Sequence, residues 1–280
     1  MNSEEILCIH LGGLGDLCLS ESLFQSLRHH FHAPLVGLGT KRFLSLFQEY
    51  FDRVHGIESA RWLYLFSSRP AEITWERIVF IGKDREGSLR SRWQPFSRSP
   101  LLFIEMYPEG AFGNISLQAQ ATHVEDFQLA QLARHGIGAL RKEVSPRPGS
   151  RVILYPEKGF KKEKWHEDNF IELYHSLKSR DIETAVMEPF DLRLGLPESI
   201  TLTELTDVKE FFSEGGIFVS NDSGMAHFAG ACGLYTVTVF IDFDPVVWHP
   251  RGAGRFLRKG VDEVNTALVE KIIMDRLALS

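Results

Sequence analysis

Residues 6–27 read ILCIHLGGLGDLCLSESLFQSL, and this stretch decides the fold class. Its apolar run at 6–11 has the length and composition of a buried strand in a parallel sheet. Gly12, Gly13 and Gly15 follow directly and predict a tight turn. Leucine and phenylalanine then recur at helical spacing. The stretch therefore predicts the strand, glycine turn and helix with which many α/β domains begin.

Short apolar runs and helical patterns continue to alternate along the chain. In the first half they predict strands at 34–38 and 75–81, and helices at 43–50 and 123–135. In the second half they predict strands at 151–155, 183–187, 216–220 and 234–241, and helices at 167–179, 208–212, 225–232 and 261–279. Gly233 is expected to end the helix at 225–232. This alternation predicts α/β domains built on parallel sheets.

The stretch SPRPGS at 145–150 separates the two halves. Two prolines and a glycine cannot continue a helix, and a strand is predicted to follow them directly. About 150 residues per domain also predicts two domains for a chain of 280 residues. We expect an N-terminal domain of residues 1–148 and a C-terminal domain of residues 149–280.

The charge of the chain argues against a generic nucleic-acid binder. The 31 basic and 37 acidic residues give a net charge of −6, whereas such binders usually carry a basic excess. Residues 1–150 hold 16 basic and 16 acidic residues, net 0, and residues 151–280 hold 15 and 21, net −6. This asymmetry predicts that the two halves handle different ligands.

Cysteine usage and hydropathy predict a cytoplasmic protein. The three cysteines are odd in number and have no CxxC spacing, which favours a reducing compartment. No uninterrupted apolar stretch reaches the roughly 18 residues of a membrane span. The first residues, MNSEE, lack the basic start of a secretory signal.

The stretch NDSGMAH at 221–227 carries the strongest local signal for a ligand site. It follows a predicted strand and opens a predicted helix, which is where open parallel sheets bind ligands. Asp222 or Ser223 is expected to cap the helix, and Gly224 lets an anion approach the backbone. The N–H groups of a helix start bind phosphates, and His227 could donate to the same group. The alternative is an ordinary cap followed by a core histidine.

The stretch YPEKGFKKEKWHEDNF at 155–170 carries a cluster of lysines between a predicted strand and a predicted helix. Clustered lysines at such a turn suit a diphosphate, although a solvated basic loop is an equal alternative. The loop is not a P-loop, because no Gly-Lys-Ser/Thr follows at the required spacing. The lysines concerned are Lys158, Lys161, Lys162 and Lys164.

The stretch GGLGD at 12–16 does not predict a dinucleotide site. The Gly-x-Gly-x-x-Gly spacing is absent, and no acidic residue ends the second predicted strand near Leu38 to bind a ribose. Gly13 and Gly15 still allow a close approach of the chain to a ligand. Asp16 begins the helix beside that space, where it acts either as a general base or as a helix cap.

Residues 83–98 form the most basic segment of the first half, with five basic and two acidic side chains, net +3. Arginine makes bidentate contacts with phosphate and carboxylate groups. The segment is therefore either a surface for an anionic substrate or a solvated loop.

Three stretches, taken in their order along the chain, resemble glycosyltransferase family 9, the ADP-heptose:lipopolysaccharide heptosyltransferases. They are ILCIHLGGLGDLCLSESLFQSLR at 6–28, YPEKGFKKEKWHEDNF at 155–170 and VSNDSGMAHFAGACGLYTVTVFIDFDPVVWHP at 219–250. The resemblance implies an α/β protein of the GT-B fold, with two Rossmann-like domains whose parallel sheets face a central cleft. It also implies inverting, metal-independent transfer of heptose from ADP-heptose to a lipopolysaccharide-type or other glycan acceptor.

The resemblance assigns roles to individual residues. Asp16 would remove the proton from the acceptor hydroxyl, with Gly13 and Gly15 beside it. Lys164 would neutralise the donor diphosphate, and Glu188 would bind the nucleoside. The donor would thus lie among Lys164, Glu188, Asp222, Ser223, Gly224 and His227.

Two alternatives of other classes stay open. One is a non-catalytic GT-B protein that binds a nucleotide or assembles with a partner, and the other is a nucleotide-sugar epimerase of the same fold. Asp242-Phe243-Asp244 resembles a metal motif of other glycosyltransferases, but Pro245 follows, so we expect a turn or helix start there and no metal or other cofactor. The expected partners are the nucleotide-sugar donor and a glycan or lipid-linked acceptor, with peripheral contact to the inner membrane face and no nucleic acid.

Overall fold

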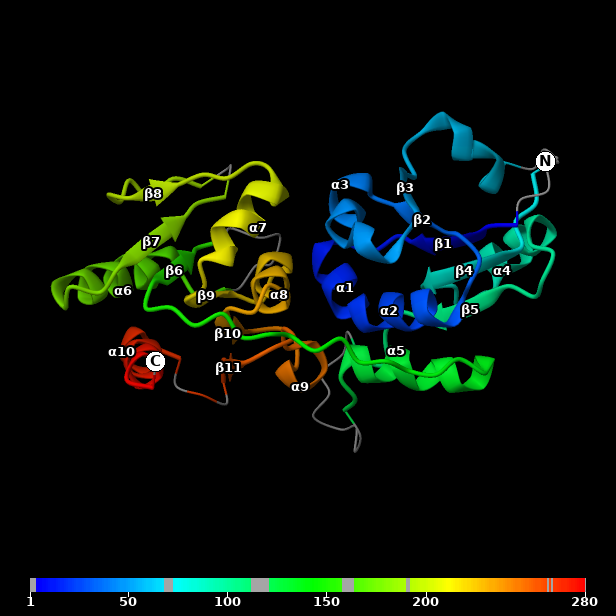
Figure 1. The fold of residues 1–280 in the computed structure, drawn as a ribbon. Coiled ribbons are helices and arrows are strands. Elements are labelled where there is room, and N and C mark those ends of the chain that lie inside the picture. Colours follow the sequence, from blue (N-terminus) through cyan, green and yellow to red (C-terminus); the bar gives the residue numbers. More distant parts are fainter. Residues whose placement is uncertain are drawn as a thin grey trace. The chain divides into compact units, whose positions relative to one another are not determined.

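The computed structural model describes residues 4–67, 73–111, 121–157, 164–189, 192–260, 262 and 264–279. The chain forms two compact α/β units (Figure 1). The first contains Met1–Glu109 and Thr122–Lys142, and the second contains Gly110–Ala121 and Glu143–Ser280. No helix of the described residues is long and apolar enough to cross a membrane.

The first unit is built on a five-stranded parallel sheet of order β3-β2-β1-β4-β5. The strands are β1 (Ile6–His10), β2 (Leu35–Gly39), β3 (Arg53–Gly56), β4 (Arg77–Gly82) and β5 (Leu102–Glu105). The helices are α1 (Leu14–Leu19), α2 (Glu21–His30), α3 (Lys41–Leu44), α4 (Ser88–Trp93) and α5 (Val124–Leu132), with 3-10 turns η1 (Ser45–Tyr50), η2 (Ala60–Leu65), η3 (Gln94–Phe96) and η4 (Ala133–His135). The chain order reverses between β1 and β4, which is the position where doubly wound sheets bind ligands.

The second unit has a six-stranded parallel sheet of order β11-β10-β9-β6-β7-β8. The strands are β6 (Val152–Tyr155), β7 (Thr184–Met187), β8 (Ser199–Ile200), β9 (Ile217–Asn221), β10 (Tyr235–Phe240) and β11 (Gly254–Arg258). The helices are α6 (Glu167–Ser179), α7 (Leu205–Ser213), α8 (Gly224–Ala231), α9 (Pro245–Trp248) and α10 (Thr266–Leu277). Read from β8, this is the order 3-2-1-4-5-6 of a Rossmann sheet, and its reversal lies between β6 and β9.

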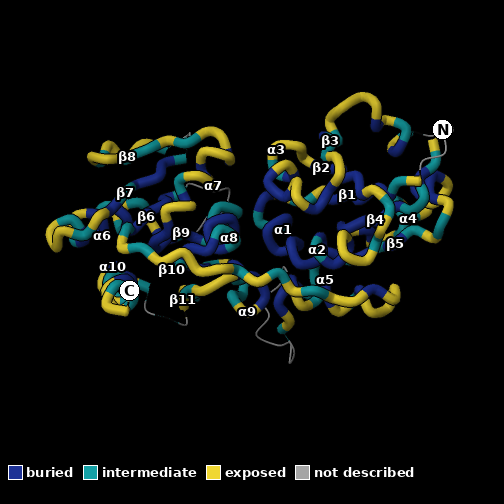
Figure 2. The backbone as a smooth tube through the Cα atoms, viewed as in Figure 1, coloured by how far each residue is buried: buried dark blue, intermediate teal, exposed yellow. Residues whose placement is uncertain are grey.

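The central strands of both sheets are buried along their whole length, as Figure 2 shows for β1 and β9. Helices on the faces of a parallel sheet remove both faces from water, which explains why these strands read as continuous apolar runs. The predicted apolar face of α6 packs into the core of the second unit through Phe170, Leu173, Tyr174 and Leu177.

Some elements differ from the sequence prediction. The first predicted helix is two helices, α1 and α2, which meet at Ser20. Short elements such as β3, β5 and α4 were not predicted, because β3 is partly exposed and reads RVHG, α4 lies within the basic segment at 83–98, and β5 is only four residues long. Gly233 does follow α8 with a φ of +94°, as expected of a residue that ends a helix.

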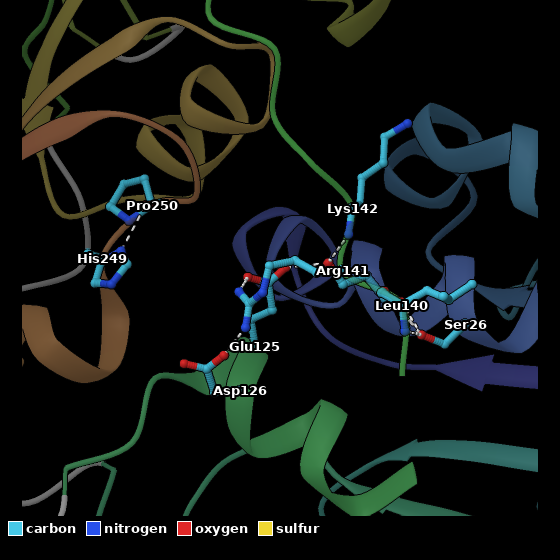
Figure 3. A network of polar contacts seen from close by, with 9 residues as sticks. Ser26, Glu125, Asp126, Leu140, Arg141, Lys142, His249 and Pro250 are labelled. Atoms are coloured by element: carbon cyan, nitrogen blue, oxygen red, sulfur yellow. Dashed lines mark hydrogen bonds and ion pairs between the residues drawn. The ribbon is translucent and has the colours of Figure 1, made fainter. Parts of the chain in front are cut away.

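The last part of the first unit is fastened to α2 and α5 (Figure 3). The Leu140 N–H donates to Ser26 Oγ at 2.8 Å, and the Lys142 N–H donates to Ser22 Oγ at 2.8 Å. Between them, Arg141 Nη1 donates to the buried Glu125 at 2.6 Å. These contacts assign residues up to Lys142 to the first unit.

The predicted linker at 145–150 belongs to the second unit rather than bridging both. The Arg147 N–H donates to Gly233 O at 2.8 Å, and its carbonyl accepts the Gly216 N–H at 3.3 Å. A Cβ on Gly233 would lie 2.2 Å from Ser145 O, so the segment passes close to this turn. The units therefore divide at Lys142, six residues before the boundary predicted at 148.

Candidate functional site

Asp16 lies in the first turn of α1, at the carboxyl end of β1. Its Oδ2 accepts the Gly13 N–H at 2.8 Å, and its Oδ1 accepts a hydrogen bond from the Tyr107 hydroxyl. The sequence left a choice between a helix cap and a base. The bond to Gly13 gives Asp16 a capping role, and the second bond shows that its other oxygen is held from another strand end.

The partners of Asp16 come from the ends of neighbouring strands. Lys83 directly follows β4, and Tyr107 lies two residues after β5. The Lys83 ammonium sits 4.6 Å from the centre of the Tyr107 ring, a cation–π distance. The carboxyl edge of the sheet thus gathers a carboxylate, a phenol and an ammonium at the point where the strand order reverses.

Burial and hydrogen bonding act on the Asp16 carboxyl in opposite directions. Burial raises the pKa of Asp16, and this outweighs the bonds from Tyr107 and Gly13 and the charge of Lys83, which lower it. Burial and the neighbouring Asp16 charge raise the pKa of Tyr107, so this phenol stays a neutral donor. A carboxylate with a raised pKa is a stronger base, which is the property that proton abstraction needs.

His10, the last residue of β1, packs against the glycine turn. Its Nδ1 accepts the Gly12 N–H at 3.2 Å, which makes Nε2 the protonated nitrogen that faces Ser20 Oγ at 3.1 Å. Burial lowers the pKa of His10 to about 3, so the ring is neutral at pH 7. A Cβ on Gly12 would lie 2.6 Å from Asp16 Cβ and 2.8 Å from His10 Cε1, so only glycine fits.

The other predicted glycines of this turn line the approach to Asp16. Gly13 is exposed and caps α1, and Gly15 is half-buried in its first turn. A Cβ on Gly13 would come no closer to its surroundings than 3.8 Å, to Asp16 Oδ2. The close approach therefore requires a glycine at position 12, while the turn is open at position 13.

In the second unit, Ser223 is the cap of α8, one of the two residues predicted for that role. Its Oγ accepts the Ala226 N–H at 3.2 Å. The N–H groups of Gly224 and Met225 belong to the first turn, where an α-helix offers no internal acceptors. Both residues are partly accessible, and the first turn carries no acidic side chain. This helix start is therefore suited to an anion.

Two further predicted residues lie at the same helix start. His227 is the buried fourth residue of α8, and its Nε2 lies 3.9 Å from Asp222 Oδ1. Asp222 is half-buried, and its N–H donates to Val239 O at 2.9 Å. The structure thus brings Asp222, Ser223, Gly224 and His227 together at the end of β9.

Lys164 is held near this helix start by its neighbour in the chain. The Trp165 N–H donates to Asn221 Oδ1 at 2.8 Å, and Asn221 Nδ2 donates to Trp165 O at 3.2 Å, which ties this segment to the end of β9. The Lys164 ammonium pairs with Glu167. Burial acts to raise the pKa of Glu167, but the bond from Lys164, a backbone hydrogen bond and the charges of Lys164 and His166 together outweigh it and lower that pKa. The lysines at 158, 161 and 162 lie outside the described residues.

Glu188 is buried directly after β7 and bonds to its own segment. Its Oε1 accepts the Leu194 N–H at 2.7 Å and the Ser199 hydroxyl at 3.1 Å, and Arg193 lies 3.8 Å from Oε2. These contacts fix the chain between β7 and β8. Nucleoside binding by Glu188 stays a prediction.

In the basic segment at 83–98, residues 88–93 form helix α4 and residues 94–96 form η3, while the side chains of Lys83, Arg85, Arg92 and Arg98 are exposed. Trp93 and Phe96 are buried in the core of the first unit. Asp84 accepts the backbone N–H groups at the start of α4 and pairs with Arg90, whose Nε lies 3.1 Å away. Part of its positive charge is therefore neutralised within the segment.

The Asp242-Phe243-Asp244 stretch starts a helix, as predicted. Asp244 Oδ1 accepts the Val246 N–H at 2.9 Å, and Oδ2 pairs with Arg258 at 2.9 Å. Across the part of the chain that the structure describes, no group of three or more His, Cys, Asp or Glu residues is arranged to hold a metal ion.

The fold of the chain defines its structural class. Both units are Rossmann-like, and the whole chain superimposes on glycosyltransferases of the GT-B heptosyltransferase type. One is the glycosyl transferase family 9 protein from Veillonella parvula DSM 2008, with a TM-score of 0.71 and 14% identity over 100% of this chain and 99% of that one. The predicted fold class and the resemblance to family 9 are thereby confirmed at the level of the fold.

Two further solved structures carry the same comparison. The E. coli heptosyltransferase WaaC with ADP has a TM-score of 0.69 and 14% identity, over 97% of this chain and 99% of that one. The E. coli ADP-heptose lps heptosyltransferase II has a TM-score of 0.64 and 15% identity, over 98% and 99%. By sequence alone, the chain matches no protein-family model and no curated protein.

Sequence reasoning missed the partners of Asp16. Tyr107 is 91 residues away in the chain, and Lys83 was read only as part of a basic segment. A signal was present, since both residues stand just after runs that read as β4 and β5. Only the strand order 1-4-5 places those two strand ends beside Asp16.

Proposed function

We propose that this protein is an inverting glycosyltransferase that moves a sugar, heptose, from ADP-heptose to a hydroxyl group of a glycan acceptor of the lipopolysaccharide type. The observation that carries the proposal is the Asp16 carboxylate, held by Gly13 and Tyr107 and made more basic by burial. The shared fold with heptosyltransferases that were solved with ADP supports the same choice of donor.

In the proposed reaction, Asp16 takes the proton of the acceptor hydroxyl as that oxygen forms its bond to the anomeric carbon. The bond between this carbon and the diphosphate breaks, and its electron pair leaves with ADP. Because attack and departure occur on opposite faces, the anomeric configuration inverts. General-base catalysis of this kind contributes typically about 10² to 10⁴-fold.

The leaving diphosphate needs positive charge and hydrogen-bond donors. We assign these to the start of α8, with Ser223 and Gly224, and to Lys164, which pairs with Glu167. Donors that are already in place at a leaving group stabilise the transition state without reorganisation. The helix start and the lysine would supply this stabilisation without a metal ion.

The test is ADP release from a panel of nucleotide sugars, ADP-heptose among them, with deacylated lipopolysaccharide cores as acceptors. In Asp16→Asn, we expect kcat to fall by about 10² to 10⁴-fold because the base is lost. The Kd for ADP, measured by calorimetry, should stay unchanged. Asp126→Asn is the matched control, because it removes an exposed carboxylate of the same unit that pairs with Arg141.

The outcomes separate the candidate functions. Tight ADP binding without transfer from any donor would favour the non-catalytic alternative, and a changed sugar without an acceptor would favour an epimerase. If the full-length protein binds neither ADP nor any nucleotide sugar, the proposed function is wrong. NMR of the product gives the anomeric configuration and so tests inversion.

A further inference from the structure

Tyr107 reaches Asp16 from a different strand end. It lies after β5, while Asp16 lies after β1, and β4 runs between these two strands. The side chain is half-buried, and its hydroxyl donates to Asp16 Oδ1. A contact across two strand positions, 91 residues apart in sequence, is set by the tertiary fold and not by the local turn.

The two donors on Asp16 act on different oxygens. Gly13 N–H bonds to Oδ2 from within the helix cap, and the Tyr107 hydroxyl bonds to Oδ1 from the opposite side of the sheet reversal. With both oxygens anchored, rotation of the carboxylate about its Cβ–Cγ bond is restricted. Each carboxylate oxygen has two acceptor positions, so a position stays available for a substrate hydroxyl.

We infer that Tyr107 is a positioning residue for Asp16: its hydroxyl, bonded to Oδ1 opposite the Gly13 bond to Oδ2, fixes the plane of the carboxylate, and Lys83 is a weaker second influence. This inference rests on the proposed function, because it assigns Asp16 the work of a base. Nothing in the family resemblance at the level of sequence pointed to either residue.

A phenol suits this role better than a cation would. It donates one directed hydrogen bond and carries no charge, so it orients the carboxylate without the full loss of basicity that a bonded ammonium would cause. Burial and the Asp16 charge raise the pKa of Tyr107, which keeps the proton on the phenol over the working pH range. The bond therefore persists whenever Asp16 is ionised.

Lys83 acts on Asp16 through its charge. Its side chain is exposed, and its ammonium lies against the Tyr107 ring at 4.6 Å. The charge of Lys83 lowers the pKa of Asp16, but less than the Tyr107 bond does. Because exposed charges are screened by salt, the influence of Lys83 should weaken as ionic strength rises.

The other titratable groups around Asp16 do not take over the influence of Tyr107 and Lys83 on its titration. His10, below the turn, is neutral because burial lowers its pKa to about 3. Arg85 and Glu105 act on Lys83 with opposite signs. A change in the titration of Asp16 on removal of the Tyr107 hydroxyl is therefore attributable to the lost hydrogen bond.

The experiment follows Asp16 directly, by ¹³C NMR of the full-length protein labelled at aspartate carboxyl carbons, with Asp16→Asn to assign the signal. In Tyr107→Phe, we expect the midpoint of the Asp16 titration to move to higher pH, because a hydrogen bond that favours the charged carboxylate is gone. Tyr50→Phe is the matched control, since it removes a tyrosine–carboxylate bond of 2.8 Å, to Glu21, in the same unit. It should leave the Asp16 midpoint unchanged.

A second variant keeps the test independent of how Tyr107→Phe folds. Lys83→Met alters an exposed side chain and should move the Asp16 midpoint upward by less, with the difference shrinking in high salt. In the transfer assay, the acid limb of kcat/KM should move with the midpoint. At a pH below the midpoint, kcat/KM falls about tenfold for each pH unit by which the midpoint rises. The KM for the donor should stay unchanged.

The results distinguish this inference from the proposed function. An Asp16 midpoint that is the same in wild type, Tyr107→Phe and Lys83→Met would overturn the positioning role even if transfer is observed. A midpoint that moves as expected, in a protein that transfers no sugar, would support the positioning of the carboxylate and reject the transferase. Movement in Tyr50→Phe as large as in Tyr107→Phe would show a general structural effect and overturn the inference.

Discussion

Helix α1 of the first unit and helix α8 of the second both begin at the carboxyl edge of a parallel sheet, next to the strand-order reversal. Their caps are both extended, with φ −78° and ψ −172° at Gly13, and φ −157° and ψ 161° at Ser223. In α1 the first turn carries Asp16, which accepts the N–H of its own cap. In α8 the first turn carries no acid, and the cap is the side chain of Ser223.

This difference decides what each helix start can bind. The positive end of α1 already has a carboxylate of its own, so it stabilises that anion and disfavours a second one. The positive end of α8 has a neutral cap and no acid in its first turn, so its next N–H groups suit an anionic ligand. One backbone plan thus yields a candidate base in one unit and a candidate phosphate site in the other, according to where a single side-chain oxygen sits.

Of three changes that test this comparison, the one with the largest expected effect is at the start of α1. In Gly12→Ala, the new Cβ would lie 2.6 Å from Asp16 Cβ, so the carboxylate must move. A misplacement of about 1 Å can cost on the order of 10²-fold in rate, and we expect kcat to fall by about that factor. Gly13→Ala, whose Cβ would come only to 3.8 Å from Asp16, is the matched control and should keep kcat within a few-fold. Equal losses in the two variants would contradict this account.

A smaller effect is expected from a substitution that gives the start of α8 an acid in its first turn, as α1 has. Met225→Asp places a carboxylate in the first turn of α8, where the helix dipole favours it by about 0.3–1 kcal/mol. We expect the helix to be slightly more stable and the Kd for ADP to rise about tenfold, equivalent to about 1.4 kcal/mol, because the site then holds its own anion. Met225→Asn, of the same shape and no charge, should change the Kd little. Calorimetry with ADP gives the Kd of both variants. If the two variants bind ADP equally well, the diphosphate does not bind at the start of α8.

The smallest effect concerns the cap itself. Ser223→Ala removes the acceptor of the Ala226 N–H, and we expect the free energy of unfolding to fall by about 1 kcal/mol. Ser223→Gly should cost only a few tenths of a kcal/mol, because glycine is tolerated as a cap. Urea unfolding of the two variants side by side provides the measurement. If neither variant is less stable than the wild type, the hydroxyl does not cap α8.

The sequence by itself determined the α/β class, the long central strands and the position of the two turns. Apolar runs such as those at 6–11 and 216–220 indicate strands that are buried on both faces of a sheet, and Gly12 and Ser223 mark turns through their own local chemistry. These signals are short-range, so they can be read from neighbouring residues. For the same reason, α6 was predicted with its observed bounds, Glu167–Ser179.

Only the tertiary structure decided which distant residues meet at those turns. Tyr107 reaches Asp16 because β5 lies beyond β4 in the sheet, and Asn221 holds Trp165 because β9 lies beside β6. The linker at 145–150 likewise joined the second unit through hydrogen bonds of Arg147 to turns far along the chain. Strand order depends on packing over the whole sheet and leaves no mark in local sequence, which is why these partners had to be found in the fold.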